Sequence, residues 1–433
     1  MLWAQAGRKD DLVVRGARVL DSAGGLDAVL DVRVDGGTVS QLGRDVPANG
    51  HRVIDGEGLL LAPAFVDPHV HLRSPGREDE ETIASGTEAA AAGGYCVILA
   101  MPNTEPPVDS AAVLGALAEA ARAEARIPVG FLAAISKGQG GSELTEMVEL
   151  AESGAAGFSD DGRPVVSPGL LRRALQYGSI TGLRLALHCE EPTLSGDGQV
   201  HEGAISAELG FAGYPSVAES VMVQRDLALA AYEGQPLHLL HLSARESVEA
   251  LRAARERGIA ATAEVTPHHL CRTDETVRTL DANVKMNPPL RSADDRAALI
   301  EALREGTIGA VATDHAPHAR HEKEVPFEAA PFGVTGLETA FGALYTHLVQ
   351  PGLLRLETLL ERMSAGPARA YGLDPPRIAA GAPANLVLID LSERWRVEEA
   401  GFRSRSANSW LLGEELQGRV RLTVADGRVA FQA

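Results

Sequence analysis

The middle of the sequence alternates short apolar runs with helical stretches, and this alternation limits the possible folds more than any other feature. Eight runs have the length and composition of β-strands: LLLAPAFVDPH, GYCVILAMPN, VGFLAAIS, GAAGFSDDG, LRLALHCE, LHLLHLS, IAATAEVTPHH and GAVATDHAP. Stretches rich in Ala, Leu, Glu and Arg, such as SAAVLGALAEAARAEA, separate several of them. Eight βα units over roughly three hundred residues predict an α/β fold, the TIM (β/α)8 barrel. An open doubly wound sheet is the alternative, but no Gly-rich dinucleotide-binding loop follows the first run.

Polar residues that can bind a metal end five of the eight runs, always at the C-terminal end of the run. The active sites of TIM barrels lie at this end of the strands. A random scatter of His and Asp would not favour one end. The placement therefore supports the barrel and predicts a functional site at its mouth.

The two ends of the chain have a different pattern of apolar and polar residues from the middle. LVVRGARVL, AVLDVRVDGG and TVSQLG near the N-terminus alternate apolar and polar residues between turn residues, which is typical of short strands. ANLVLIDL and GRVRLTVADGRVAFQA repeat this pattern near the C-terminus, with a hairpin signal at Asp426-Gly427. We predict a small β-sandwich domain built from residues 1–60 and 380–433, and a barrel domain over residues 61–379. Separate folding of the two ends is the alternative.

Charge and composition argue against several classes of function. The formal net charge is −19, and no cluster of Lys and Arg is present to meet a polyphosphate, so we expect no nucleic acid partner. No apolar run reaches the ~18 residues of a membrane span, and the first residues lack the apolar segment of a secretory signal. Cys96, Cys189 and Cys271 form no CxxC pair, which favours a reducing cytoplasm.

The first candidate ligands follow the first run, in the segment Asp67-Pro68-His69-Val70-His71. Residues two apart in an extended chain point the same way, so His69 and His71 can hold one ion together. Two histidines brought to a strand edge by chance are the alternative, but their place after an apolar run favours metal binding.

The fourth run ends in Asp160-Asp161, where one carboxylate could bridge two ions. An ordinary Asp-Asp-Gly turn is the alternative, and alternation alone does not choose between the two carboxylates.

Single histidines end the fifth and sixth runs, at His188 and His241, and Asp314 ends the eighth. Each alone has an ordinary explanation, either a hydrogen-bonded core histidine or a carboxylate that caps a helix. His238 lies an odd number of residues from His241, so we expect it to face away and interpret it as structural. Taken together, four histidines and two carboxylates at one barrel mouth predict a binuclear hydrolytic metal site.

The order of these strings resembles that of a known family. DPHVHLR, MPNT, GFSDDG, the two single histidines, NPPLR and ATDHAPH resemble, in this order, the dihydroorotases of the amidohydrolase superfamily. In hydantoinases, allantoinases and another branch of dihydroorotases a carbamylated lysine bridges the metals, but this chain has no Lys between Lys137 and Lys285. It is similar instead to the class I branch with an aspartate bridge, and this resemblance selects Asp161 over Asp160. Ser74 departs from the family, which usually has Glu there.

The resemblance implies six ligands for one or two divalent ions, with Zn²⁺ expected: His69, His71, Asp161, His188, His241 and Asp314. His69, His71 and Asp314 would hold one ion, and Asp161 would bridge it to the other. As the catalytic residue, Asp314 would take a proton from water and return it to the leaving nitrogen. The implied activity is the reversible hydrolysis of (S)-dihydroorotate to N-carbamoyl-L-aspartate in de novo pyrimidine (UMP) biosynthesis.

Substrate contacts are expected around the same mouth. Two divalent ions, two carboxylates and one hydroxide leave a formal excess of about one positive charge, which suits a small anionic substrate. Arg73, two residues beyond His71, is placed to meet a carboxylate bidentately. By resemblance, Asn103 and His318 would share that carboxylate and Asn287 would lie near the ring. The charged segment from Arg320 to Gly333, which contains Pro and Gly, is interpreted as a lid.

Two alternative functions stay open at this point. One is another cyclic-amide hydrolase, such as a hydantoinase or allantoinase, against which the missing lysine and Arg73 argue. The other is a catalytically silent subunit that scaffolds aspartate transcarbamoylase, against which the complete ligand set argues. For an active enzyme we expect a homodimer and consider aspartate transcarbamoylase as a further partner. The sequence does not decide between one and two bound ions.

Overall fold

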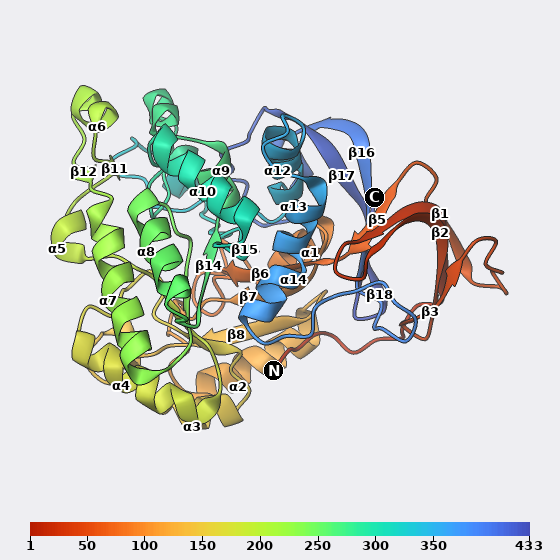
Figure 1. Ribbon diagram of the computed structural model, residues 1–433, viewed down its shortest axis with the longest axis horizontal. Helices are drawn as coiled ribbons and strands as arrows, with labels where there is room; N and C mark the ends of the chain where they lie inside the picture. Colours follow the sequence, from red (N-terminus) through yellow and green to blue (C-terminus); the bar gives the residue numbers. More distant parts are fainter.

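The computed structural model describes residues 1–433 and divides into a barrel and a sheet built from both chain ends (Figure 1). Eight neighbouring parallel strands form the barrel sheet: β6 (Phe65–Val70), β7 (Tyr95–Ala100), β8 (Val129–Ala133), β9 (Gly157–Ser159), β10 (Leu185–Leu187), β13 (Leu237–Leu239), β14 (Ala261–Val265) and β15 (Ala310–Val311). A parallel bridge between Val70 and His315 brings the last strand back to the first, and the His71 amide donates to the His315 carbonyl at 2.8 Å. The predicted TIM barrel is confirmed.

Helices connect the barrel strands and cover them on the outside (Figure 1). The helices with eight or more residues are α1 (Ile83–Ala92), α2 (Ala111–Glu124), α4 (Pro168–Thr181), α7 (Val217–Glu233), α8 (Arg245–Glu256), α10 (Ala293–Glu305) and α13 (Leu356–Met363). Shorter helices lie in the loops: α3 (Met147–Glu152), α5 (Pro192–Ser195), α6 (Ala204–Leu209), α9 (Pro267–Cys271), α11 (Arg320–Lys323), α12 (Ala340–Leu344) and α14 (Ala365–Ala370). None of the helices is both long enough and apolar enough to cross a lipid bilayer.

Local sequence explains where several of these helices begin and which face they bury. Ser292 caps α10 by accepting from the Asp295 amide, and the Asp295 side chain accepts from the Ser292 amide in return, which forms a capping box. Helix α8 buries Val248, Leu251 and Ala254, which lie three residues apart and therefore share one stripe. Such stripes pack the helices against the barrel sheet.

The second sheet takes strands from both ends of the chain. Its members are β1 (Leu12–Asp21), β2 (Leu26–Asp35), β3 (Thr38–Gly43), β4 (Arg52–Asp55), β5 (Leu60–Pro63), β16 (Leu386–Arg396), β17 (Glu415–Ala425) and β18 (Arg428–Gln432). The strand order is β18-β17-β16-β5-β1-β2-β3, with β4 beside β1. The antiparallel pairing of β5 with β16 joins the two ends, so the predicted assembly from both termini is confirmed. Asp426 and Gly427 turn the β17–β18 hairpin with φ values of 47° and 71°.

The first predicted strand is in fact two strands that belong to different sheets. Leu60–Pro63 pairs with β16 in the terminal sheet, whereas Phe65–Val70 starts the barrel. The chain changes sheets at Ala64, whose amide donates to the Asn385 carbonyl, while the next amide, of Phe65, donates to the Gly94 carbonyl. The sequence does not reveal this change, because both strands are buried along their whole length and the residues around the change are continuously apolar.

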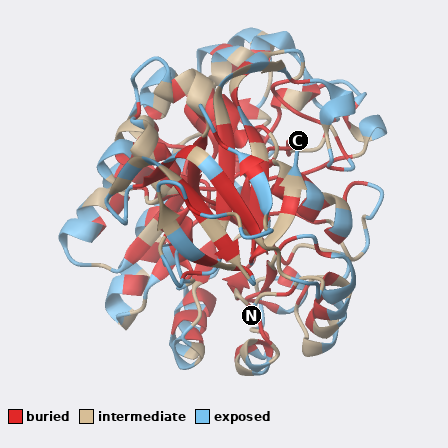
Figure 2. Cartoon of the chain, turned by 90° about the vertical axis from the view of Figure 1, so that its right-hand side faces the viewer, coloured by how far each residue is buried: buried red, intermediate tan, exposed pale blue.

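The apolar core divides into a main cluster with side chains from both sheets and a smaller cluster on the terminal sheet. The main cluster contains 88 buried residues, and a separate cluster of 15 fills the terminal sheet with side chains such as Val14, Val34 and Leu386. Figure 2 looks onto the side of this sheet and shows buried residues in the central strands and exposed residues on the outer helices. Two further short strands, β11 (Val200–His201) and β12 (Gly213–Tyr214), pair in a loop region outside both sheets.

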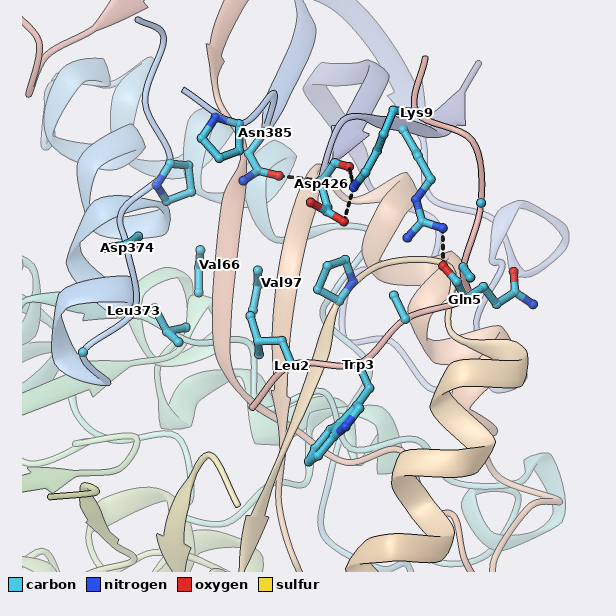
Figure 3. Close-up of a pocket in the computed structure, with 18 residues that line it drawn as sticks. Leu2, Trp3, Gln5, Lys9, Val66, Val97, Leu373, Asp374, Asn385 and Asp426 are labelled. Carbon is cyan, nitrogen blue, oxygen red and sulfur yellow. Dashed lines mark hydrogen bonds and ion pairs between the residues drawn. The ribbon is translucent and has the colours of Figure 1, made fainter. Parts of the chain in front are cut away.

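The largest cavity lies at the N-terminal side of the barrel strands, between the barrel, the terminal sheet and the N-terminal segment (Figure 3). It has a volume of about 800 Å³ and is lined in part by Val66, Val97 and Asn385. Lys9 and Asp426 form an ion pair at its edge. None of the candidate metal ligands lines this cavity, so its size gives no reason to place the chemistry there.

Candidate metal centre

All six candidate ligands meet at the C-terminal mouth of the barrel. His69 lies in β6 and His71 just beyond it, while the other four follow the ends of β9, β10, β13 and β15: Asp161, His188, His241 and Asp314. Every one of them is buried, with exposed fractions between 0% and 6%. Five separate segments therefore place four imidazoles and two carboxylates in one small volume.

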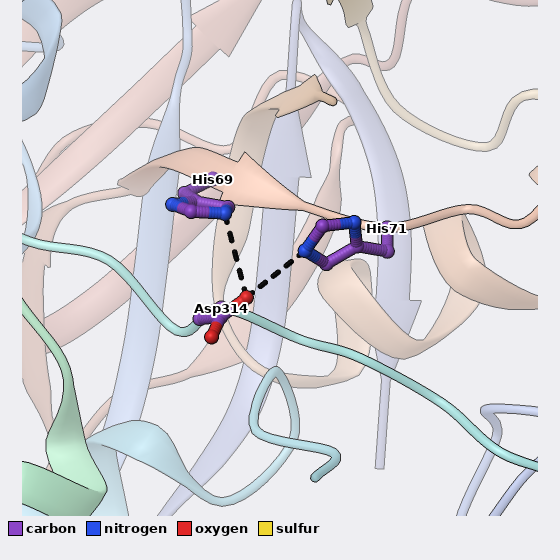
Figure 4. Close-up of side chains that lie close together, drawn as sticks. All are labelled: His69, His71 and Asp314. Atoms are coloured by element: carbon purple, nitrogen blue, oxygen red, sulfur yellow. Dashed lines mark hydrogen bonds and ion pairs between the residues drawn. The ribbon is translucent and has the colours of Figure 1, made fainter. Parts of the chain in front are cut away.

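His69, His71 and Asp314 form the first group of this cluster (Figure 4). Asp314 Oδ1 lies 3.0 Å from His71 Nε2 and 3.4 Å from His69 Nε2. Both imidazoles thus turn the same nitrogen toward one carboxylate oxygen. This is the arrangement of a three-ligand set that shares a cation.

His188 and His241 form the second group, and Asp161 lies between the two groups. Its Oδ2 is 3.6 Å from His69 Nε2 and 3.5 Å from His71 Nε2. Its Oδ1 is 3.4 Å from His188 Nδ1 and 3.5 Å from His241 Nε2. One carboxylate therefore offers one oxygen to each group, as a bridging ligand would.

Asp160 points away from the cluster. Its Oδ1 accepts from the amides of Ile135 and Ser136 at 2.8 and 3.1 Å, and the Ser136 hydroxyl donates to its other oxygen. Of the two aspartates that alternation left open, only Asp161 faces the histidines.

The donor set fits divalent cations. His69 Nε2 and Asp161 Oδ1 are buried and have no hydrogen-bond partner, which is costly unless another group completes them. Burial opposes charge on His69, but Asp161 and Asp314 outweigh it and raise the pKa of His69 well above its ordinary value. Burial likewise opposes charge on Asp161, and His69, His188 and His241 outweigh it and lower the pKa of Asp161 well below its ordinary value. The two carboxylates therefore stabilise positive charge at this place. Bound cations would supply that charge, and the imidazoles would then bind them in the neutral form.

Backbone strain is also concentrated here. His241 and Asp314 have φ values of 29° and 48°, and Arg73 beside them has 57°. Residues other than Gly seldom adopt this left-handed region, and such residues occur preferentially at functional sites. The strain accompanies the turns that bring side chains of separate strands together.

A carboxylate that the sequence analysis missed supports the first group. Glu264, in β14, accepts from His69 Nδ1 at 2.7 Å and from His238 Nε2 at 2.9 Å. It thereby fixes which nitrogen of His69 faces Asp314. His238, interpreted above as structural, contacts Thr262 and Glu264 and none of the candidate ligands. A signal for Glu264 was present, since it is the one charged residue within the run IAATAEV.

We expect Glu264→Gln to weaken metal binding about 10- to 100-fold, because partners that orient a ligating histidine have effects of this size. Metal content after dialysis against a graded chelator series measures this loss. Thr262→Val, which removes the hydroxyl that His238 contacts on the same strand, serves as a control that should keep the metal. Unchanged metal retention in Glu264→Gln would show that the carboxylate is only structural.

The second group and His71 have similar supports. Glu190 Oε2 lies 3.0 Å from His188 Nε2 and also accepts from Asn287 Nδ2 at 3.0 Å. Asn103 Oδ1 accepts from His71 Nδ1 at 2.9 Å. Asn103 and Asn287, chosen above as substrate contacts, therefore each also touch the ligand network.

A pocket of about 370 Å³ opens directly above the cluster. Beside five of the candidate ligands it is lined by Arg73, Asn103, Gly162, Asn287, Ala316 and the strip Pro331–Gly333. Arg73 Nε lies 3.0 Å from Glu80 Oε2 and donates to the Pro317 carbonyl at 3.0 Å. These contacts fix the guanidinium at the pocket wall.

His318 is the one predicted substrate contact that does not line this pocket. Its Nδ1 is 3.0 Å from Glu80 Oε1, and its Nε2 donates to the Phe332 carbonyl at 2.8 Å. Both ring nitrogens are therefore engaged with the protein, one of them with the carbonyl of Phe332, which lines the pocket. The structure places His318 as a support of that strip and of Arg73, whose Nη2 is 3.4 Å away.

Comparisons with known proteins agree with this architecture. Residues 60–430 match the model of the Amidohydrolase family. A dihydroorotase of Anaeromyxobacter dehalogenans is 47% identical over 429 residues, which are 98% of each chain. A dihydroorotase of Caldanaerobacter subterraneus is 42% identical over 421 residues, which are 97% of each chain. Among solved structures, the L-hydantoinase of Arthrobacter aurescens has a TM-score of 0.86 at 27% identity and covers 97% of this chain and 96% of its own.

Proposed function

The chain belongs to the amidohydrolase family, and from this premise we infer that it is a dihydroorotase, which hydrolyses the ring amide of (S)-dihydroorotate reversibly to N-carbamoyl-L-aspartate. Relatives of that name match at 41–47% identity over nearly the whole chain, whereas the structurally similar hydantoinase is 27% identical. The observation that carries the proposal is the placement of Asp161. A carboxylate lies where a hydantoinase-like site is expected to hold a carbamylated lysine, and it contacts both histidine groups.

We propose that the six clustered residues hold one or two Zn²⁺ ions. Sets of histidines and carboxylates of this kind suit zinc. When bound, such an ion lowers the pKa of water to about 7 and polarises a carbonyl oxygen. The orphaned buried atoms His69 Nε2 and Asp161 Oδ1 support the assignment of the site.

Asp314 is the residue that we propose moves the proton. It meets His71 and His69 through Oδ1, and the residue lines the pocket, so its second oxygen is proposed to face the substrate. From this place the carboxylate would accept a proton from the attacking water and deliver it to the ring nitrogen as the C–N bond breaks. In the biosynthetic direction the same carboxylate would take that proton back as the ring closes.

Arg73 is proposed to bind the carboxylate of the substrate. Its Nε is held by Glu80 and the Pro317 carbonyl, so the guanidinium is preorganised before the substrate arrives. Asn103, which we propose shares that carboxylate, and Asn287, which we propose lies near the ring, line the same pocket. His318, by contrast, would act on the substrate only through Arg73 and Phe332.

A substrate panel with the purified protein tests this function. We expect kcat/KM for dihydroorotate to exceed the values for hydantoin and allantoin by at least about 100-fold, because a site built to bind a carboxylate leaves its polar groups unpaired with the neutral rings. Removal of metal by a chelator should abolish turnover, and Zn²⁺ should restore it. Preference for hydantoin or allantoin would assign the chain to another cyclic-amide hydrolase, and inactivity of the metal-loaded protein would favour the scaffold alternative.

The assembly and location of the enzyme are separate proposals. We propose a cytoplasmic homodimer that is able to associate with aspartate transcarbamoylase, in keeping with the resemblance to dihydroorotases. Sedimentation of the protein alone and with that partner checks both associations.

A further inference from the structure

Two of the four lysines in the chain are buried beside the substrate pocket. Lys285 is 2% exposed and Lys323 8% exposed, whereas Lys137 is exposed and paired with Glu143. Neither buried lysine forms an ion pair. Lysine is seldom buried without a carboxylate, because removing an ammonium group from water is costly. Their contacts therefore need an explanation.

Lys285 reaches from the segment before Asn287 into the predicted lid. Its Nζ donates to the Phe327 carbonyl at 2.9 Å and to the Glu328 carbonyl at 3.0 Å. The ammonium also lies 4.8 Å from the centre of the Phe332 ring and 5.3 Å from that of Phe327, within the range of a cation–π contact. One charge thus contacts main chain and aromatic rings of the same loop.

Lys323 makes the reverse connection, from the lid back to the segment that contains Lys285. Its Nζ donates to the Ala282 carbonyl at 3.1 Å and lies 3.5 Å from the Lys285 carbonyl. It also donates to the Pro331 carbonyl at 2.8 Å. The two lysines therefore cross-link the same two segments from opposite sides, and all their hydrogen bonds go to main-chain carbonyls.

The part of the lid that lines the substrate pocket is the strip Pro331–Gly333, which begins at a carbonyl that Lys323 contacts. The Gly333 amide donates to the Lys285 carbonyl at 3.0 Å, and the Phe332 carbonyl accepts from His318. Gly333 has a φ of 131°, and a Cβ there would lie 2.8 Å from the Ala316 Cβ. The strip is thus held close to the pocket by polar contacts and leaves no room for a side chain at Gly333.

We propose that Lys285 and Lys323 are positioning residues for substrate binding, because their side-chain amino groups hold the strip Pro331–Gly333 as a wall of the pocket. This inference rests on the proposed function of the pocket, and neither lysine touches the candidate ligands. Hydrogen bonds from the lysines to main-chain carbonyls fix the position of the main chain itself. Apolar packing of the same loop would fix that position less specifically. Binding of substrate then requires less ordering of the loop.

Kinetics of Lys285→Met and Lys323→Met, with Lys137→Met as the matched control, test the proposal. We expect KM for dihydroorotate to rise about tenfold in the first two variants, as for lost hydrogen bonds from a charged group. Because Asp314 and the ligands are untouched, kcat should change less than roughly threefold. Lys285→Arg should recover part of the lost affinity, and Lys137→Met should match the wild type. Unchanged KM in both folded Met variants would overturn the proposal.

Acetylation of the full chain, read by mass spectrometry, provides a measurement that does not depend on activity. Burial lowers the pKa of Lys323 to about 7, so its amine would react readily with a reagent that reached it. We expect Lys137 to be acetylated first and Lys285 and Lys323 to be protected, with Lys323 becoming reactive in Lys285→Met. Equal reactivity of Lys323 and Lys137 in the wild type would contradict a held strip. A wild type without dihydroorotate turnover would refute the proposed function. The acetylation result would still show whether Lys285 and Lys323 are held in buried positions.

Discussion

Asp314→Asn should lower kcat for dihydroorotate by about three orders of magnitude, because a positioned general acid–base group typically contributes 10²- to 10⁴-fold. Asparagine has nearly the same shape and keeps an oxygen toward His71, but it does not accept a proton. Since His69, His71 and Asp161 stay in place, the variant should retain most of its metal. Steady-state kinetics together with metal analysis of the same preparation measure both effects.

The change in kcat and the change in metal content together show which role Asp314 has. Loss of kcat with metal retained assigns proton transfer to Asp314, whereas loss of both would mean that the residue acts mainly as a ligand. Asp226→Asn is a suitable control, because Asp226 is a buried aspartate that contacts Arg225 and Cys189 and does not line the pocket. A kcat near the wild-type value in Asp314→Asn would refute the proposed proton transfer.

Much of the fold could be predicted from the sequence because the barrel repeats one pattern. Each apolar run followed by polar residues is a strand whose C-terminal end faces the mouth, so His69, His71, His188, His241 and Asp314 could be selected together, as a set at the ends of several strands. The pairing of the chain ends was likewise visible in the alternation of both termini. Local pattern and global fold agree at these positions.

The remaining features depend on geometry that no local pattern contains. The change of sheets at Ala64 lies within a uniformly apolar run. His241 and Asp314 lie on strained backbone beyond the strand ends, where alternation no longer predicts the direction of a side chain. Lys285 and Lys323 meet only because the loop after β15 folds back over the segment after β14. Contacts across such long separations are set by tertiary packing.

Asp161→Ala should cause the other large loss, this time of metal and activity together. The carboxylate contacts all four histidines of the cluster, so its removal takes one ligand from each group and leaves the buried imidazoles without a nearby negative charge on that side. We expect metal content to fall by at least half and kcat to fall at least about 10³-fold, since catalysis here depends on bound metal.

The neighbouring aspartate provides the matched control. Asp160 is equally buried, but it binds Ile135 and Ser136 rather than the histidines. Asp160→Asn should therefore lower the melting temperature, because it disturbs these hydrogen bonds, while metal content and kcat stay close to the wild type. If Asp160→Asn lost the metal and Asp161→Ala kept it, the bridging assignment would be wrong. If both variants kept the metal, neither carboxylate would bridge, and the two histidine groups would have to bind their ions independently.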